Sequence, residues 1–238
     1  MSDAFPSDPF EAQCRLMSGL AKSDITIFDV GANKGQTAAN YRRRFPAAEI
    51  YCFEPFPESV ATLQAAFSND EHTHVVPKAV AEKSGTATFY VTKFDATHSL
   101  LPRFTSGRRY YPEWAGPKET IDIEAIALDD FIGDKRISTV DILKMDVQSG
   151  ELLVLRGAQS LLRTAGVSLI YTEIMFVPHY EGSPLFHEMT SYLSGFGFSL
   201  FQIYNLHTAP NGQLRFGEAI FVSDRVRSDV IDAYPEET

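Results

Sequence analysis

A glycine loop, Asp29-Val30-Gly31-Ala32-Asn33-Lys34-Gly35-Gln36-Thr37, joins a predicted strand to a predicted helix and decides the fold of this 238-residue chain. The strand is the apolar run at 25–30, and the helix at 36–45 ends before a proline. The glycines permit a tight turn and bring the backbone close to a ligand, toward which the helix directs free N–H groups. The loop matches neither G-x-G-x-x-G nor a G-K-[ST] phosphate loop, so the dinucleotide fingerprint is incomplete.

Strand-like and helix-like segments alternate on both sides of this loop. Further strands are predicted at 50–53, 75–80, 86–92, 120–127, 140–147 and 167–175, and further helices at 57–67, 151–163 and 185–193. Two last strands, at 199–205 and 214–222, flank the turn Pro210-Asn211-Gly212 and should form an antiparallel hairpin. The pattern predicts an α/β, doubly wound, Rossmann-like sheet with a reversed strand near one edge.

We expect one domain at 25–238, preceded by an extension at 1–24 that contains one helix. Apolar residues make up 44% of the chain and charged residues 22%, as in ordinary globular proteins. The 21 basic and 31 acidic side chains give a net charge of −10, which disfavours binding to nucleic acids and anionic membranes. With no secretory signal, no apolar membrane span and two cysteines lacking C-x-x-C spacing, a cytoplasmic protein is expected.

A carboxylate follows the loop at the spacing of a ribose-binding acid. Glu54 ends the second predicted strand in Phe53-Glu54-Pro55, where it can accept hydrogen bonds from the hydroxyls of an adenosine ribose. The alternative is a solvated carboxylate at a strand end. A loop without the third glycine suits a ligand without phosphates. The glycine loop and Glu54 together therefore favour S-adenosylmethionine over NAD.

The sequence resembles the FkbM family of S-adenosylmethionine-dependent methyltransferases. The blocks that carry the resemblance are the glycine loop, Phe53-Glu54-Pro55, Lys78-Ala79-Val80 with Ser84-Gly85, and Leu143-Lys144-Met145-Asp146-Val147-Gln148-Ser149-Gly150-Glu151-Leu152. The resemblance implies a class I methyltransferase fold with a seven-stranded sheet. It also implies methyl transfer to a hydroxyl of a small molecule, commonly a sugar or a natural product.

The resemblance also implies which residues hold the cofactor. The glycine loop would hold the methionine part, Glu54 the ribose, and the backbone at Ala79 and Val80 the adenine. The full set of expected contacts is Asp29, Gly31, Ala32, Asn33, Gly35, Gln36, Glu54, Pro55, Ala79, Val80, Ser99, Asp146 and Val147. This chain departs from the family where members often read D-V-E-G, because Gln148 and Ser149 replace the acid and the glycine.

Three residues are candidates for the base that takes a proton from the acceptor hydroxyl. Asp146 and Glu173 each end a predicted strand, and His179 lies in the loop after the strand that contains Glu173. Asp146 could instead orient the cofactor, Glu173 could be structural, and His179 could be a surface residue. His98 could also reach the pocket. No metal site is predicted, because His72 and His74 lack an obvious third ligand.

The segment 94–118 is long, basic and aromatic, and we interpret it as a loop insertion that covers the acceptor. Loops of this length within a compact domain often serve as lids or substrate-binding segments. Its cations and rings are Arg103, Arg108, Arg109, Lys118, Tyr110, Tyr111 and Trp114. The alternative is a solvated loop whose rings pack back on the domain.

Two other functions remain open from the sequence. A nicotinamide-dependent oxidoreductase is disfavoured by the missing third glycine and by the lack of a Tyr-x-x-x-Lys pair. A methyltransferase-like binding module without activity is disfavoured by the intact glycine loop and Glu54. The changes at Gln148 and Ser149 leave the inactive binding module open as an alternative.

Overall fold

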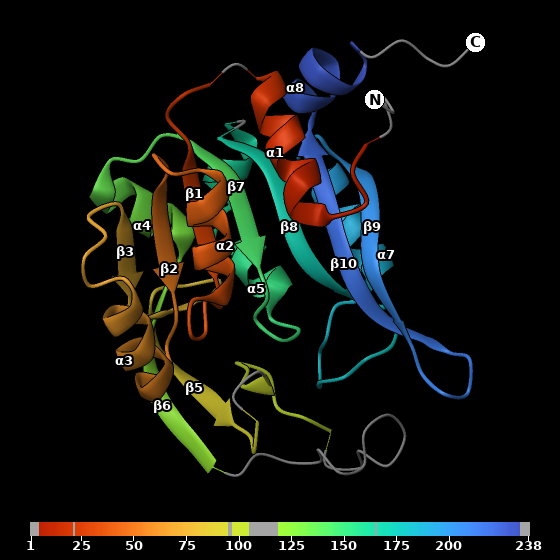
Figure 1. The fold of residues 1–238 in the computed structure, drawn as a ribbon. Helices are drawn as coiled ribbons and strands as arrows, with labels where there is room; N and C mark the ends of the chain where they lie inside the picture. Colours follow the sequence, from red (N-terminus) through yellow and green to blue (C-terminus); the bar gives the residue numbers. More distant parts are fainter. Residues whose placement is uncertain (1–4, 21, 95–96, 105–118, 165, 234–238) are drawn as a thin grey trace.

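The computed structural model describes residues 5–20, 22–94, 97–104, 119–164 and 166–233 (Figure 1). The strands are β1 (Thr26–Val30), β2 (Glu49–Phe53), β3 (Thr73–Val76), β4 (Ala79–Val80), β5 (Gly85–Val91), β6 (Glu119–Ile126), β7 (Val140–Met145), β8 (Val167–Met175), β9 (Phe198–Thr208) and β10 (Leu214–Ser223). The helices are α1 (Pro9–Gly19), α2 (Gln36–Arg44), α3 (Pro57–Ala66), α4 (Leu128–Lys135), α5 (Glu151–Arg156), α6 (Gln159–Arg163), α7 (Phe186–Ser194) and α8 (Asp224–Val226), followed by the π-helical turn η3 (Arg227–Ile231). Within the described segments, no helix has the length and apolar character to cross a membrane.

A seven-stranded sheet in the order β3-β2-β1-β7-β8-β10-β9 forms the centre of the described chain. Every neighbouring pair is parallel except those of β10, which runs antiparallel to both β8 and β9. This arrangement confirms the predicted doubly wound sheet with a C-terminal antiparallel hairpin. Val30 is level with both Phe53 and Met145, so β1, β2 and β7 end at one edge of the sheet.

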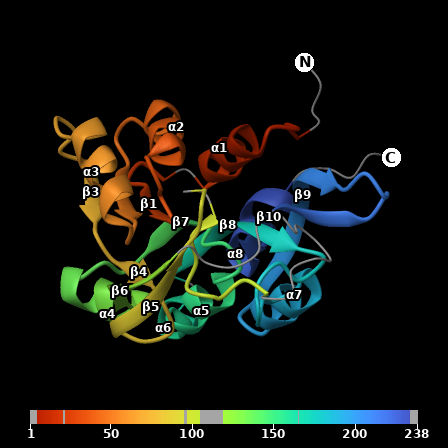
Figure 2. The ribbon, with the colours of Figure 1, turned by 90° about the horizontal axis from the view of Figure 1, so that it is seen from below.

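Helices cover both faces of this sheet (Figure 2). Helices α1, α2 and α3 lie on one face, and α4 to α7 lie on the other. Successive strand residues alternate between the two cores, so Ile27 packs with Leu16 and Tyr41 whereas Phe28 packs with Phe131. All five side chains are nearly or fully buried, which is why these strands appear as continuous apolar runs.

The predicted strand at 75–80 is wrong, because the structure divides it between two sheets. Pro77 separates β3 from β4, and a proline has no N–H to continue a strand ladder. β4 pairs with β6 in a second sheet of order β4-β6-β5. Figure 1 shows β5 and β6 beyond the carboxyl ends of β1 and β2.

The predicted helix at 151–163 is also divided, into α5 and α6. The break falls at Gly157, where a Cβ atom would lie 2.2 Å from the carbonyl oxygen of Ala81. The carboxylate of Asp129 caps the amino end of α6, because it accepts hydrogen bonds from the backbone N–H groups of Ser160 and Leu161. Helix α4, to which Asp129 belongs, was not predicted from the sequence.

The helix predicted in the amino-terminal extension is α1. Asp8 caps it by accepting hydrogen bonds from the N–H groups of Phe10 and Glu11. Its buried residues Ala12, Leu16 and Met17 belong to the same core as α2 and the central strands. The extension therefore contributes to the packing of one face of the sheet.

Candidate functional site

A pocket opens where β1, β2, β4 and β7 end, as expected for a doubly wound sheet. Eight residues predicted to contact the cofactor line it: Gly31, Asn33, Glu54, Pro55, Ala79, Val80, Asp146 and Val147. The remaining lining residues are Val30, Phe53, Phe89, His98, Leu100 and Gln148. The residues that the sequence placed in separate blocks thus meet around one cavity.

Five residues from the predicted set do not line the pocket: Asp29, Ala32, Gly35, Gln36 and Ser99. Asp29 lies fully buried beneath the glycine loop, and Ser99 donates a hydrogen bond of 2.7 Å to the carbonyl oxygen of Gln148. Both residues therefore lie beneath the residues that line the pocket. The sequence analysis missed Phe89, whose alternation in β5 could have indicated a buried side chain but not its neighbours.

Gly31 allows the loop to pass against the end of β7. Its φ of +75° is readily accessible to glycine, and a Cβ atom there would lie 2.0 Å from the carbonyl oxygen of Asp146. The N–H groups of Gly31 and Ala32 both donate to the carbonyl oxygen of Phe53, at 3.0 Å each. The loop is therefore held between the ends of β2 and β7, and its backbone forms one wall of the pocket.

A buried ion pair supports the loop from below. The Nζ atom of Lys144 lies 2.8 Å from Oδ1 of Asp29 and donates to the carbonyl oxygen of Gly31 at 3.0 Å. Burial alone would lower the pKa of Lys144, but the carboxylates of Asp29 and Asp146 raise it above the ordinary value. The ammonium group therefore stays charged and ties the loop to β1 and β7.

Glu54 is buried in the pocket wall with both carboxylate oxygens engaged. Oε2 accepts from the N–H of Asn33 and Oε1 accepts from the N–H of Phe56, each at 2.9 Å. Burial raises the pKa of Glu54, and the two backbone donors work against that rise. Because each carboxylate oxygen has a further lone pair, Glu54 can still accept hydrogen bonds from two ligand hydroxyls.

Asn33 and His98 add polar groups to the pocket. Oδ1 of Asn33 is buried and has no hydrogen-bond partner among the described residues, so a donor on a ligand would satisfy it. Nδ1 of His98 accepts the N–H of Thr92 at 3.1 Å, which assigns the ring hydrogen of a neutral imidazole to Nε2. The sequence analysis expected that His98 could reach the pocket, and the structure confirms this.

One side-chain amide brings two candidate bases together. Nε2 of Gln148 donates to Oδ1 of Asp146 at 3.0 Å and to Oε2 of Glu173 at 3.1 Å. Asp146 is exposed, whereas Glu173 is partly buried. Burial, followed by the charges of the neighbouring carboxylates Asp146 and Glu151, raises the pKa of Glu173 well above its ordinary value. The ionised form of such a carboxyl group is a stronger base than that of an exposed one.

The third candidate base, His179, is not a lining residue of this pocket. Its ring packs edge-on against Phe216, with 5.9 Å between the ring centroids. Burial and the charges of Arg103 and Arg215 lower the pKa of His179 to about 4. The imidazole is therefore neutral at pH 7 and is a weak base.

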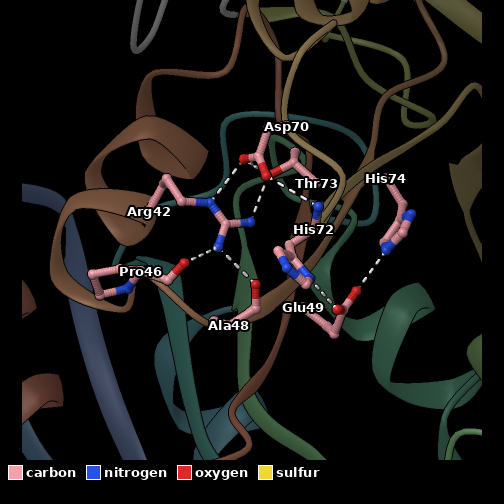
Figure 3. A network of polar contacts seen from close by, with 8 residues as sticks. All are labelled: Arg42, Pro46, Ala48, Glu49, Asp70, His72, Thr73 and His74. Carbon is pink, nitrogen blue, oxygen red and sulfur yellow. Dashed lines mark hydrogen bonds and ion pairs between the residues drawn. The ribbon is translucent and has the colours of Figure 1, made fainter.

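His72 and His74 lie elsewhere, at the β3 edge of the sheet (Figure 3). Each donates to a different carboxylate oxygen of Glu49, and Arg42 nearby binds Asp70 at 2.8 Å. Hydrogen bonds within this network tie the edge of the sheet to the loop that precedes β3. No group of histidine, cysteine and carboxylate side chains within the described residues is arranged to hold a metal ion.

Residue 94 and the segment 97–104 are the described parts of the predicted acceptor loop. His98 and Leu100 line the pocket, and Nη2 of Arg103 donates to the hydroxyl of Tyr180 at 2.9 Å. The Arg103 guanidinium also lies 4.6 Å from the centroid of the Tyr180 ring, at cation–π distance. The other predicted lid residues lie outside the described residues: Arg108, Arg109, Lys118, Tyr110, Tyr111 and Trp114.

The turn after β7 adopts an unusual backbone conformation. Gln148 and Ser149 have φ values of +55° and +74°, a region that costs a non-glycine residue about 1–2 kcal/mol. The hydroxyl of Ser149 is buried without a hydrogen-bond partner among the described residues. The turn therefore carries two strained residues beside the pocket.

We expect Ser149→Gly to raise the free energy of unfolding by about 1 kcal/mol, because it relieves the strained φ and removes an unpaired buried hydroxyl. Urea denaturation followed by circular dichroism measures this. Ser160→Gly, in α6, is the matched control and should be destabilising. Equal losses of stability in both variants would contradict this account of the turn.

The methyltransferase FkbM domain model matches residues 29–200. NoeI of Sinorhizobium fredii, a 2-O-methyltransferase, is 26% identical over 185 residues, which cover 74% of this chain and 74% of that protein. The 31-O-demethyl-FK506 methyltransferase FkbM of Streptomyces tacrolimicus is 28% identical over 172 residues, covering 63% of this chain and 66% of that protein. Among solved structures, Aeropyrum pernix fibrillarin with natively bound S-adenosyl-L-methionine is 16% identical, with a TM-score of 0.45, and the match covers 87% of this chain and 72% of that one.

Proposed function

The chain belongs to the FkbM family of methyltransferases, and on this basis we propose that it methylates a hydroxyl oxygen of a small molecule. It is an enzyme of the S-adenosylmethionine-dependent class, with the class I methyltransferase fold. The observation that carries the proposal is the convergence of Glu54, Asp146 and Glu173 on the same edge of the sheet. The first residue offers ribose contacts, and the other two adjoin the place where a donor and an acceptor would meet.

The pocket fits this cofactor through its own unsatisfied groups. Glu54 retains lone pairs for the ribose hydroxyls, and the buried Oδ1 of Asn33 can accept a hydrogen bond from the methionine part. Ala79 and Val80 offer an apolar wall for the adenine. The glycine loop carries no phosphate-binding motif, in keeping with a cofactor that has no phosphate groups. When bound, S-adenosylmethionine supplies a methyl group attached to a positively charged sulfur.

Glu173 would act as the base for the acceptor. S-adenosylmethionine would supply the methyl group to the acceptor oxygen and keep the electron pair of the carbon–sulfur bond, while the Glu173 carboxylate would take the hydroxyl proton. Burial and neighbouring carboxylates raise the pKa of Glu173, which makes its ionised form a stronger base than an ordinary carboxylate. Asp146 lines the pocket itself and would orient the cofactor.

The acceptor would be a hydroxylated small molecule such as a sugar or a natural product. The names of both relatives specify methylation at oxygen, one at a 2-O position and one at a 31-O position. A test would supply S-adenosylmethionine with a deuterated methyl group and a panel of hydroxylated sugars and polyketides. We expect the label on an oxygen of the product, located by NMR. Label on nitrogen or carbon, or cofactor binding without transfer to any hydroxyl, would contradict the proposal.

We expect Glu54→Gln to weaken S-adenosylhomocysteine binding by about 1–3 kcal/mol, because the ribose hydroxyls lose a charged acceptor. Isothermal titration calorimetry measures the difference between the variant and the unmodified protein. Glu58→Gln, an exposed change in the neighbouring helix α3, is the matched control and should leave the affinity unchanged. An unchanged dissociation constant in a folded Glu54→Gln protein would remove Glu54 from the cofactor site.

A further inference from the structure

We propose that Gln148 is a positioning residue, whose amide holds the carboxylate of Glu173 beside the cofactor pocket in the orientation needed to accept the substrate proton. This inference rests on the proposed O-methyl transfer, for which Glu173 is the base. Gln148 touches the pocket wall and reaches Glu173, whereas Glu173 itself does not line the pocket. Among the described residues, the amide of Gln148 therefore connects Glu173 to the cofactor pocket by a hydrogen bond.

The hydrogen bonds of the amide fix its orientation. A carboxylate can only accept, so the NH₂ group must face Asp146 and Glu173, and its two hydrogens are both used. The amide oxygen faces the hydroxyl of Tyr180 at 3.3 Å. That hydroxyl has one hydrogen, and its shorter bond, of 2.9 Å, goes to the carbonyl oxygen of Thr97. The contact with Gln148 is thus the longer branch of a shared hydrogen bond.

The backbone of Gln148 is also held in place. Its φ of +55° turns the chain at the end of β7, and Ser99 donates to its carbonyl oxygen at 2.7 Å. Tyr180, which the amide oxygen contacts, is buried and belongs to the segment after β8. Segments from three parts of the chain therefore determine where the amide points. A strained residue that several contacts hold in place is typical of functional sites.

Charge explains why an amide suits this position. Glu173 is surrounded by the carboxylates of Asp146 at the end of β7, Glu151 at the start of α5 and Glu218 on β10, with Lys144 as the opposing cation. The neutral amide donates to Glu173 and Asp146 at once, without adding negative charge. An acid at 148, as in the D-V-E-G pattern, would remove both donors and add another carboxylate. Gln148 therefore favours the ionised, proton-accepting form of Glu173.

The test is a direct titration of Glu173 in the full chain by ¹³C NMR of its carboxyl carbon, assigned with Glu173→Gln. We expect Gln148→Glu to raise the pKa of Glu173 by about one unit or more, because a like charge replaces a donor. Gln148→Asn, whose amide is one carbon too short to reach, should raise it as well. Gln64→Glu places the same charge change on the exposed face of α3 and should have no effect.

An unchanged Glu173 titration in both Gln148 variants would overturn the proposal. Thermal unfolding identifies a variant that fails to fold, in which case the other variant carries the test. The measurement needs no acceptor, so it is independent of the proposed reaction: absence of methyl transfer would contradict the function without altering the titration. Once an acceptor is known, the acidic limb of the pH–rate profile should move to higher pH in Gln148→Glu.

Discussion

Glu173→Gln should lower turnover by about 10²–10⁴-fold, the usual contribution of a positioned general base, and leave cofactor affinity unchanged. The amide side chain keeps the size of the carboxylate but cannot take the acceptor proton. Because Glu173 does not line the cofactor pocket, its replacement should not disturb binding of S-adenosylhomocysteine. Steady-state kinetics with the labelled methyl donor, combined with calorimetry, measure both quantities.

The other candidate bases are the controls for this prediction. Asp146→Asn should weaken cofactor binding and leave the shape of the pH–rate profile unchanged, since Asp146 lines the pocket. His179→Ala should have a small effect on turnover, since a histidine whose pKa is about 4 is a weak base. Full activity in Glu173→Gln, or a loss in His179→Ala equal to that predicted for Glu173→Gln, would place the base elsewhere.

Lys144→Met should lower the free energy of unfolding by about 3–5 kcal/mol, the cost of leaving a buried charge without its partner. Asp29 is fully buried, and its ion pair with Lys144 spans 2.8 Å beneath the glycine loop. Methionine preserves most of the side-chain volume, so the expected loss comes from the charge rather than from a cavity. Urea denaturation at pH 7 measures the change.

The ion pair of Lys78 with Glu124 provides a matched comparison on the surface. Its atoms are also 2.8 Å apart, but both side chains are accessible to solvent. Lys78→Met should therefore change stability little. The double variant Lys144→Met with Asp29→Asn should recover part of the stability, because no unpaired charge remains. Equal effects of Lys144→Met and Lys78→Met would contradict the structural role of the buried pair.

The central sheet could be predicted because its signals are local. The apolar run of β1, the glycine loop and the acid at position 54 lie within one βαβ unit, so their spacing specifies their relative positions. The second sheet could not be predicted in the same way. The strand at 75–80 was predicted to continue across Pro77, and the pairing of β4 with β6 joins residues far apart in the chain.

The residues that line the pocket were predicted more completely than the hydrogen bonds that hold those residues in place. Residues that end strands, such as Glu54 and Asp146, are identified by position alone. The contacts of Gln148 with Ser99, Glu173 and Tyr180 depend on tertiary packing between distant segments. The substitution at 148 was visible in the sequence as a departure from the family pattern, but its hydrogen bonds were not.

The measurement that tests the account most directly is calorimetric titration of the purified protein with S-adenosylhomocysteine and, separately, with NAD. The glycine loop without a pyrophosphate fingerprint and the carboxylate of Glu54 predict that S-adenosylhomocysteine binds with a dissociation constant in the micromolar range, about 1–100 μM. NAD should give no measurable binding at the same concentrations. Tighter binding of NAD than of S-adenosylhomocysteine would contradict the account.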